Sequence, residues 1–266
     1  MLSVGVGEPR PSSSVILVRD GPLGLETFMV LRHARSPVLP SAYVFPGGTV
    51  RPDDLDLDLP PALSQRLAHG LSDRSDSPVD AAQASAYYVS ATRELFEEAG
   101  VLLVHDAGGR LLSVDAADRE LQERLASTRL ALQARDLSLS RVLTDWQCRP
   151  AFDLLVPFSH WVTPLLLAAR FDTRFFVAEM PPGQAALHDT IELSDGIWLP
   201  PERLLAGDYH VVYATAQHLR RLVPFQTAQA LLEFARQKPI HRLSPDIVED
   251  GSGLQAFIRP ELVDAW

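Results

Sequence analysis

Cysteine is almost absent from this chain: Cys148 is the only one among 266 residues. An internal disulfide and a zinc site built from cysteines are therefore excluded. Eight histidines occur without the spacing of metal ligands, and His160 is expected to be a buried core residue. A single cysteine is typical of proteins in a reducing compartment, and a cytoplasmic protein is predicted.

Long apolar runs and positive charge are also scarce. Residues 154–169 form the most apolar stretch, but it contains two prolines, a serine and a histidine and is too short to span a bilayer comfortably. Residues 1–13 lack the apolar core of a secretory signal and are interpreted as a flexible arm. The net charge of −10 disfavours nucleic acid and anionic membranes as partners. A phosphate-bearing small molecule stays compatible, because a bound divalent cation reverses the charge locally.

The patterns that are present indicate a folded α/β (α+β) protein. Residues 14–19 and 27–32 predict two antiparallel strands, and residues 84–99 have apolar side chains at helical spacing, ended by Gly100. Further strands are expected at 101–104, 173–179 and 190–199, and further helices at 201–205, 214–222 and 225–236.

One domain over residues 14–237 is predicted from these elements, with two insertions. Residues 51–83 are acidic, polar and interrupted by proline, which is typical of a surface insertion. Because the insertion lies beside the glutamate-bearing helix, a substrate lid is one hypothesis for its role. Residues 115–150 predict a helical insertion with two helices, and residues 238–266 a helical C-terminal extension. The sequence leaves a homodimer open.

Three glutamates give the chain its clearest chemical signal. Glu94, Glu97 and Glu98 stand at positions i, i+3 and i+4 of the predicted helix, so their carboxylates share one face. They lie in its last turn, where the helix dipole disfavours negative charge, and only Arg93 is placed to pair locally, with Glu97. A solvated acidic helix end is one interpretation. The other is a cluster that requires a cation, and carboxylate oxygens suit Mg²⁺ or Mn²⁺ rather than zinc.

Two motifs together resemble the Nudix box of the Nudix hydrolases. Residues 45–48 read Phe-Pro-Gly-Gly, and residues 93–101 read Arg-Glu-Leu-Phe-Glu-Glu-Ala-Gly-Val. In that family a glycine-rich loop leads into a helix that carries R-E-x-x-E-E-x-G and a following aliphatic residue. The box is split here, with about 31 residues inserted between its halves, and Ser85 stands where the usual pattern has an early glutamate. The resemblance implies the Nudix fold, a mixed sheet sandwiched between helices.

The resemblance narrows to one subgroup and covers roughly residues 14–235. The split box, the Trp-Val-Thr-Pro of residues 161–164 and the Arg-Phe-Asp-Thr-Arg-Phe-Phe of residues 170–176 are similar to a Nudix subgroup whose eukaryotic members are peroxisomal coenzyme A diphosphatases. A separate signature of coenzyme A-cleaving relatives has a glycine where this chain has Ser41, so the substrate stays open.

This family pattern implies roles for the box residues. Glu94, Glu97 and Glu98 are expected to hold Mg²⁺ or Mn²⁺, with the backbone carbonyl of Gly47 as a further ligand. Glu97 and Glu98 are the predicted catalytic glutamates, and Arg93 is expected to hold Glu97 in position. The ion supplies Lewis-acid polarisation of the phosphate and helps to orient the attacking water.

A general base and phosphate-binding groups are expected outside the box. Glu192, shortly before a tryptophan-bearing strand, is the predicted base, with Glu179 as the competing candidate. The predicted substrate-binding residues are Arg32, Arg35, Gly48 and Arg174. For Arg174 an ion pair with Asp172 is the alternative interpretation.

Three functional hypotheses follow from the sequence. The first is an Mg²⁺-dependent hydrolase that cuts the phosphoanhydride bond of coenzyme A or an acyl-coenzyme A into 3′,5′-ADP and the 4′-phosphopantetheine moiety. The second keeps the chemistry but takes NADH, ADP-ribose or another dinucleotide. The third is a non-catalytic module that senses a nucleotide. All the box glutamates are present, which favours an enzyme acting on a small nucleotide-containing molecule.

Overall fold

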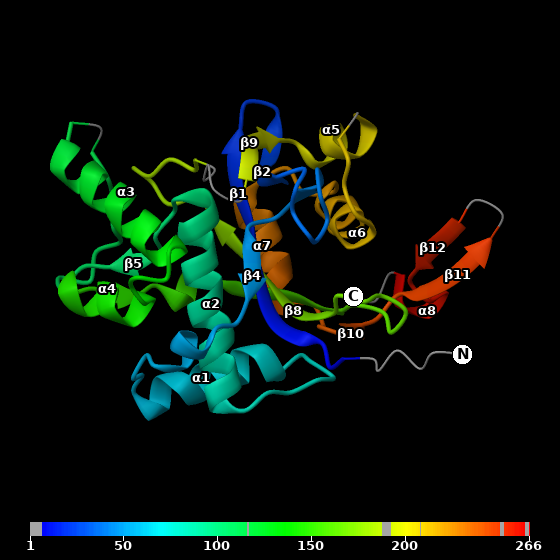
Figure 1. Ribbon diagram of the computed structural model, residues 1–266, viewed down its shortest axis with the longest axis horizontal. Helices are drawn as coiled ribbons and strands as arrows, with labels where there is room; N and C mark the ends of the chain where they lie inside the picture. The colour runs from blue at the N-terminus through cyan, green and yellow to red at the C-terminus, as the bar shows by residue number, and fades with distance from the viewer. Residues whose placement is uncertain (1–6, 116, 188–192, 208, 251–252, 264–265) are drawn as a thin grey trace.

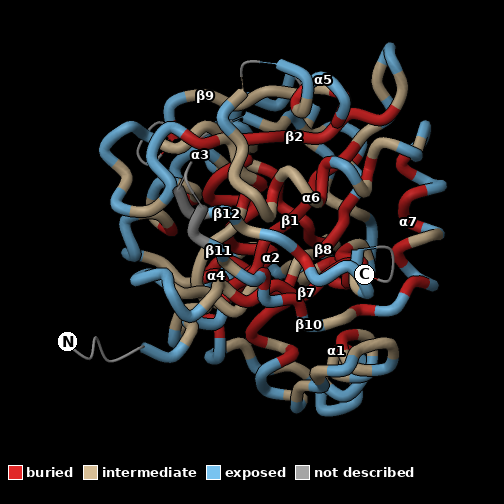
Figure 2. Tube along the Cα trace, turned by 90° about the vertical axis from the view of Figure 1, so that its right-hand side faces the viewer, coloured by how far each residue is buried: buried red, intermediate tan, exposed pale blue. Residues whose placement is uncertain are grey.

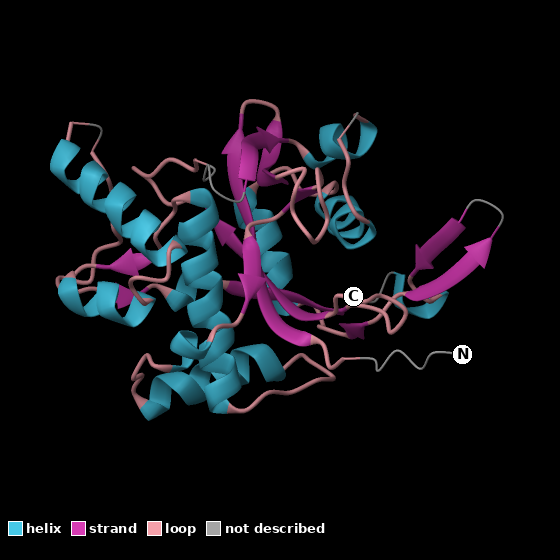
Figure 3. Cartoon of the chain, viewed as in Figure 1, coloured by secondary structure: helices cyan, strands magenta, loops and turns pink. Residues whose placement is uncertain are grey.

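The computed structural model describes residues 7–115, 117–187, 193–207, 209–250, 253–263 and 266. Within these residues, helices cover both faces of one mixed eight-stranded sheet (Figure 1, Figure 3). Its strands are β1 (Arg10–Gly21), β2 (Gly24–Arg32), β3 (Tyr43–Val44), β4 (Gly47–Thr49), β7 (Val156–Val162), β8 (Phe171–Glu179), β9 (Leu193–Leu199) and β10 (Arg242–Leu243). They follow the order β10-β7-β8-β1-β2-β3, while β4 pairs with β1 and β9 with β2. The predicted class, a mixed sheet between helices, is confirmed.

The first two strands form the predicted hairpin. β1 and β2 are antiparallel, with Val18 opposite Thr27, and the turn uses Gly24 at a φ of 105° that favours glycine. β1 starts earlier than predicted: Arg10 pairs with Phe171 of β8. Residues 10–13 are therefore part of the sheet, and the prediction that they belong to a flexible arm is wrong. The strand was missed because Arg-Pro-Ser-Ser has no apolar alternation.

Side chains of β1 alternate between two cores on opposite faces of the sheet. Val15 and Leu17 pack in the core that contains α2 (Ala81–Ala99), whereas Ile16 and Val18 pack with α6 (Tyr213–Leu222) and α7 (Ala228–Gln237). Buried positions accordingly concentrate along the strands (Figure 2). The other described helices are α1 (Pro61–Ser72), α3 (Arg119–Gln133), α4 (Leu139–Asp145), α5 (Pro201–Ala206) and α8 (Pro260–Val263), with 3₁₀ turns η1 (Pro52–Leu55) and η2 (Phe152–Leu154).

Helix α2 carries the glutamates and is buried along most of its length. Asp80 caps its start by accepting from the amide of Gln83, and Gly100 ends it at a φ of 71°. The chain then stays buried over residues 101–103, but only β5 (Val104–His105) is a strand, paired with β6 (Arg149–Pro150). The predicted helix and its end are confirmed, but of the strand predicted at 101–104 only Val104 is in a strand.

The segment between the two halves of the box is built into the domain. Its helix α1 packs against α2 through the buried side chains Leu67 and Leu71. Arg74 donates hydrogen bonds to the carbonyls of Ala235 and Lys238, 2.6 and 2.7 Å away, and so ties the segment to the end of α7. The segment therefore packs against α2 and is bonded to the end of α7, and its role as a substrate lid stays a prediction from the sequence.

The C-terminal residues differ from the predicted helical extension. β10 joins the central sheet beside β7, and β11 (Asp246–Asp250) pairs with β12 (Gly253–Phe257) as a hairpin that projects from the domain (Figure 1). Only α8 is helical. Pro245 and Pro260 flank the hairpin. Its strands pair with each other from Asp246 opposite Phe257, so a helix in the place of the hairpin is excluded. No helix in the described part of the chain is both long and apolar enough to cross a membrane.

Candidate active site

Strand β4, which carries Gly47 and Gly48 and is called the glycine strand below, lies in direct contact with helix α2. A Cβ atom at Gly48 would overlap the carboxylate of Glu94, and a Cβ atom at Gly47 would lie 2.5 Å from the carbonyl oxygen of Ser13. The amide of Gly47 donates a 2.8 Å hydrogen bond to Oε2 of Glu98. The two glycines therefore allow β4 to lie between β1 and the acidic face of α2, where the space on either side of the strand is too narrow for a side chain.

All three box glutamates are buried, with exposed fractions of 6% for Glu94, 4% for Glu97 and 5% for Glu98. They line the same cavity, as their shared helical face predicted. The alternative of a solvated acidic helix end is wrong. Buried carboxylates require compensating positive charge or hydrogen bonds, because burial in a low-dielectric interior disfavours the ionised form.

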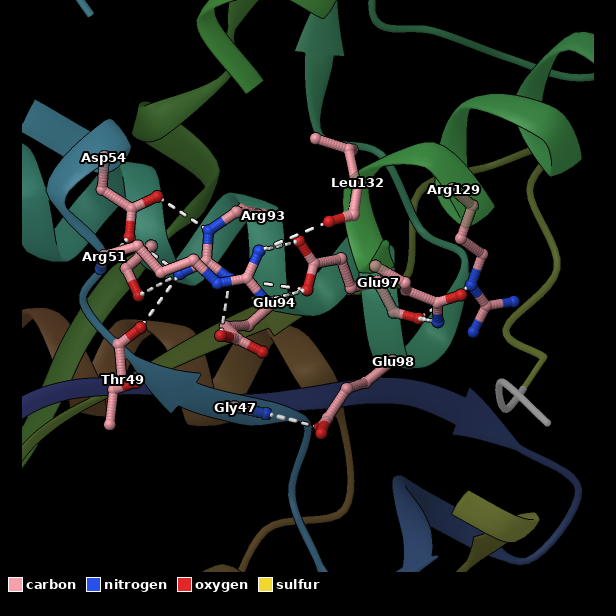
Figure 4. A network of polar contacts seen from close by, with 12 residues as sticks. Gly47, Thr49, Arg51, Asp54, Arg93, Glu94, Glu97, Glu98, Arg129 and Leu132 are labelled. Atoms are coloured by element: carbon pink, nitrogen blue, oxygen red, sulfur yellow. Dashed lines mark hydrogen bonds and ion pairs between the residues drawn. The ribbon is translucent and has the colours of Figure 1, made fainter. Parts of the chain in front are cut away.

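Arg93 supplies part of this compensation from a fully buried position (Figure 4). Its Nε and Nη2 atoms donate to both carboxylate oxygens of Asp54 at 2.7 Å, and Nη1 donates to Glu94 at 2.6 Å. The expected partner, Glu97, is farther away at 3.5 Å. Arg93 therefore positions Glu94 more directly than Glu97, and its main partner is Asp54, which the sequence analysis missed.

Arg51 is the second cation and holds Glu97 instead (Figure 4). Its two Nη atoms donate to the two oxygens of Glu97 at 2.8 and 2.7 Å in a bidentate pair. Such pairs fix orientation as well as supplying charge. Arg51 and Asp54 both belong to the segment that splits the box. The acidic run of that segment was the only feature of the sequence that marked it. The partners Arg51 and Glu97 are 46 positions apart and Asp54 and Arg93 are 39 apart, so no local pattern predicts either pair.

The end of α2 is fixed by a third set of contacts. Arg129 and Gln133 of α3 donate to the backbone carbonyl of Glu97 at 2.9 and 2.7 Å. The last carbonyls of a helix lack intrahelical partners. These two bonds give the carbonyl of Glu97 the hydrogen-bond partners that it would otherwise lack. The predicted helical insertion thus has a role in holding the acidic turn.

The pKa values of Glu97 and Arg93 are shifted because several charged side chains are buried close together. Burial and the neighbouring charge of Glu94 raise the pKa of Glu97 to about 7, against the opposing effect of Arg93 and Arg51. Burial alone disfavours a charged Arg93, but the hydrogen bonds to Asp54 and the charges of Glu94, Asp54 and Glu97 raise its pKa above the ordinary value. Negative charge is therefore in excess at the acidic turn.

The donor set fits a divalent cation. Three carboxylates, those of Asp54, Glu94 and Glu97, contact the guanidinium groups of Arg51 and Arg93, and a fourth, Glu98, accepts from the amide of Gly47, so carboxylates outnumber these guanidinium groups. Among the described residues no three acidic, histidine or cysteine side chains already converge on one point. Each glutamate instead accepts from a protein donor: Glu94 from Arg93, Glu97 from Arg51 and Glu98 from the amide of Gly47.

A cavity of about 610 Å³ opens beside the acidic turn. It is lined at this end by the three glutamates, by Gly47 and Gly48 and by Arg32 and Arg51. These include every predicted metal ligand and two of the predicted substrate-binding residues. A volume of this size is typical of sites for small molecules and cofactors.

Other predicted site residues are not brought to this cavity. Arg35 is exposed and lies outside the lining, as does Glu179, the competing base candidate. Arg174 is 3% exposed, donates to the carbonyl of Ser77 and lies over the ring of Tyr87. The prediction that Arg174 contacts substrate is therefore wrong, whereas substrate contact by the exposed Arg35 stays a prediction. Glu192 lies outside the described residues.

Strand alternation explains the position of Arg174. Thr173 and Phe175 point from β8 into the cavity, so the side chain between them points to the opposite face, toward α2. The alternative ion pair with Asp172 is not formed either: Asp172 bonds Nε2 of His160 at 2.7 Å. His160 is 1% exposed, which confirms its predicted place in the core.

Comparison with known proteins supports the family suggested by the box. A family model described as the NUDT19 Nudix domain matches residues 1–210. The acyl-coenzyme A diphosphatase NUDT19 of Homo sapiens is 29% identical over 91% of this chain and 75% of its own length. The Xenopus laevis protein of that name is 27% identical over 68% of this chain, which spans only 54% of that relative.

A solved structure gives the same result for the fold. The crystal structure of a NUDIX hydrolase from Alicyclobacillus acidocaldarius is 27% identical, with a TM-score of 0.63, over 86% of this chain and 97% of that one. The family model covers most of the chain, and the buried acidic turn with its glycine strand carries the family motif. This chain therefore belongs to the Nudix hydrolase family, and its Nudix domain is of the NUDT19 type.

Proposed function

We propose that this protein is a metal-dependent hydrolase of the phosphoanhydride bond in coenzyme A or its acyl thioesters, with 3′,5′-ADP and the (acyl-)4′-phosphopantetheine as products. The observation that carries the proposal is the set of three buried glutamates packed against a glycine strand at one end of a 610 Å³ cavity. The names of the NUDT19 relatives support the choice of substrate.

The metal ligands in this proposal are Glu94, Glu97 and Glu98, with the carbonyl of Gly47 as a further ligand. Nudix hydrolases generally use divalent metals, and carboxylate oxygens favour Mg²⁺ or Mn²⁺. When bound, the ion supplies Lewis-acid polarisation and lowers the pKa of a bound water. Arg93 and Arg51 hold Glu94 and Glu97 in place, so the ligands lose less freedom when the ion binds.

Phosphate recognition falls to the cations of the lining. Arg32 lies at the cavity, with its guanidinium fixed by Ser36 and by the carbonyl of Val38 at 2.9 and 3.0 Å. Gly48 allows a substrate to approach the backbone closely. Glu192 as general base, a homodimer and a cytoplasmic location stay predictions from the sequence.

A substrate panel tests the proposal. Purified protein with Mg²⁺ is incubated with coenzyme A, acyl-coenzyme A, NADH, ADP-ribose and diadenosine polyphosphates, and products are identified by mass spectrometry. We expect 3′,5′-ADP from the coenzyme A compounds, and none from Glu98→Gln. Glu123→Gln serves as the matched control, because Glu123 of α3 is exposed and outside the cavity.

Two results would contradict the proposal. Cleavage confined to NADH or ADP-ribose would keep the chemistry and replace the substrate. Nucleotide binding without any cleavage would favour the sensor hypothesis.

A further inference from the structure

We propose that the far end of the cavity, which we call the apolar arm, binds the acyl chain of the substrate and makes acyl thioesters better substrates than free coenzyme A. The arm is lined by Trp161, Leu167, Phe171, Phe175, Ile247 and Ala256. This inference rests on the proposed function and assigns a second binding site within the same cavity.

The arm is continuous with the acidic turn. One cavity contains both the box glutamates and these apolar side chains. In the sheet, β1 beside the glycine strand is followed by β8 and then β7. Two strand spacings, about 10 Å, therefore separate β1 from the arm's wall at β7. A molecule that places its diphosphate at the glutamates and extends across these strands reaches the arm.

Part of the arm's wall comes from outside the common Nudix domain. The family model matches residues 1–210, whereas Ile247 and Ala256 belong to the C-terminal hairpin. These two residues are register partners, and both line the cavity. Val248, the next residue along, points away and is 49% exposed. One face of the hairpin is thus directed at the cavity, which suits a role in choosing among substrates rather than in the shared chemistry.

The loop between β7 and β8 adds exposed hydrocarbon beside the arm. Leu165, Leu166 and Leu167 are 64%, 71% and 42% exposed, and Leu167 lines the cavity. Large apolar side chains gathered on a surface are characteristic of binding sites. A chain that enters along this loop removes Leu167 from water and continues toward Phe171.

An acyl chain fits this lining better than the adenine of the same substrate does. Adenine recognition requires hydrogen-bonding groups that face the ligand. Two polar side chains here contact the protein itself: the hydroxyl of Thr163 accepts from the amide of Phe171 at 3.0 Å, and the hydroxyl of Tyr213 accepts from the amide of Ile258 at 2.8 Å. The indole nitrogen of Trp161 has no hydrogen-bond partner but is buried. The aromatic and aliphatic side chains of the arm therefore favour a hydrocarbon ligand.

A chain-length series tests the inference. The kcat/KM with Mg²⁺ is measured for free coenzyme A and for its acetyl, butanoyl, hexanoyl, octanoyl and dodecanoyl thioesters. We expect kcat/KM to rise about two- to fourfold for each methylene until the arm is filled, the range that partial to full burial of a methylene gives. Free coenzyme A shares every group except the acyl chain, so the ratio to free coenzyme A isolates the arm.

Matched variants locate the effect. Leu167→Asn and Ile247→Asn place a polar group in the arm, and we expect the octanoyl-to-free-coenzyme A ratio to fall about 4- to 64-fold, the loss of two to three methylenes at two- to fourfold each. Val248→Asn, next to Ile247, and Leu23→Asn, in the turn between β1 and β2, make the same change at exposed positions outside the lining and are expected to keep the wild-type ratio.

The outcomes separate the two proposals. Cleavage of free coenzyme A without any dependence on chain length overturns the apolar arm and leaves the proposed function standing. An equal fall of the octanoyl-to-free-coenzyme A ratio in the arm variants and in the control variants also overturns the proposal that the arm binds the acyl chain. If no coenzyme A compound is cleaved at all, the proposed function fails, and the arm fails with it.

Discussion

Asp54 and Arg93 form the most deeply buried ion pair of the acidic turn, and replacing Asp54 by asparagine removes its negative charge while keeping its shape. Both Arg93 contacts to Asp54 are 2.7 Å long, and the two side chains are 1% and 0% exposed. Breaking a buried pair costs about 3–5 kcal/mol when one charge is left alone. Arg93 keeps Glu94 and the carbonyl of Thr49 at 3.0 Å, so the expected loss for Asp54→Asn is about 2–3 kcal/mol.

Urea unfolding followed by circular dichroism measures this loss as a lower midpoint at unchanged m-value. A loss of 2–3 kcal/mol corresponds to a melting temperature lower by about 4–12 °C for a domain of this size. We also expect kcat to fall more than KM changes, because Arg93 holds Glu94 by a 2.6 Å contact.

Asp56→Asn is the control, since Asp56 is exposed in the same segment. If Asp54→Asn unfolded within about 0.5 kcal/mol of wild type, the variation of ordinary surface substitutions, the view that the inserted segment braces the box would be wrong.

Three further perturbations test the site and the core. Gly48→Ala introduces a Cβ atom into the Glu94 carboxylate, and steady-state kinetics should show a loss of about 10²-fold in kcat/KM, the cost of a displacement near 1 Å. Arg51→Met leaves Glu97 without its bidentate partner, and differential scanning calorimetry should show a lower melting temperature that Mg²⁺ partly restores. Burial lowers the pKa of Lys238 from 10.5 to about 7. Between pH 7 and 10.5 the unfolded chain keeps the lysine proton and the folded protein releases it. The free energy of unfolding should therefore rise with pH in this range by up to about 1.4 kcal/mol per pH unit relative to Lys238→Met.

Matched variants and opposite results accompany these three. Gly70→Ala adds a Cβ only 3.4 Å from a tyrosine hydroxyl, an ordinary contact, and should keep full activity. Arg66→Met changes an exposed arginine of α1 and should not alter the response to Mg²⁺. Full activity of Gly48→Ala would contradict the tight strand–helix contact. Parallel pH profiles for wild type and Lys238→Met would show that Lys238 keeps its ordinary pKa.

Local patterns were sufficient for several features. The apolar periodicity of α2 and the left-handed position of Gly100 defined the helix and its end. The spacing of Glu94, Glu97 and Glu98 defined their shared face, because 3.6 residues complete one helical turn. The glycine pair at residues 47 and 48 gave the close approach of the strand. In each case the determining interactions lie within a few residues of each other.

Tertiary structure alone decided the partners of these groups. The pairs Asp54–Arg93 and Arg51–Glu97 join residues 39 and 46 positions apart, and a charge in a proline-interrupted acidic run does not identify such a partner. The direction of Arg174 depended on the register of β8, where a shift of one residue exchanges the two faces of a strand. The apolar arm exists only where distant segments meet, because its lining comes from residues 161–175 and from the hairpin at residues 246–257. The sequence by itself determined which groups carry charge and where helices and strands favour forming, whereas long-range packing determined which charges are buried together and what the cavity accepts.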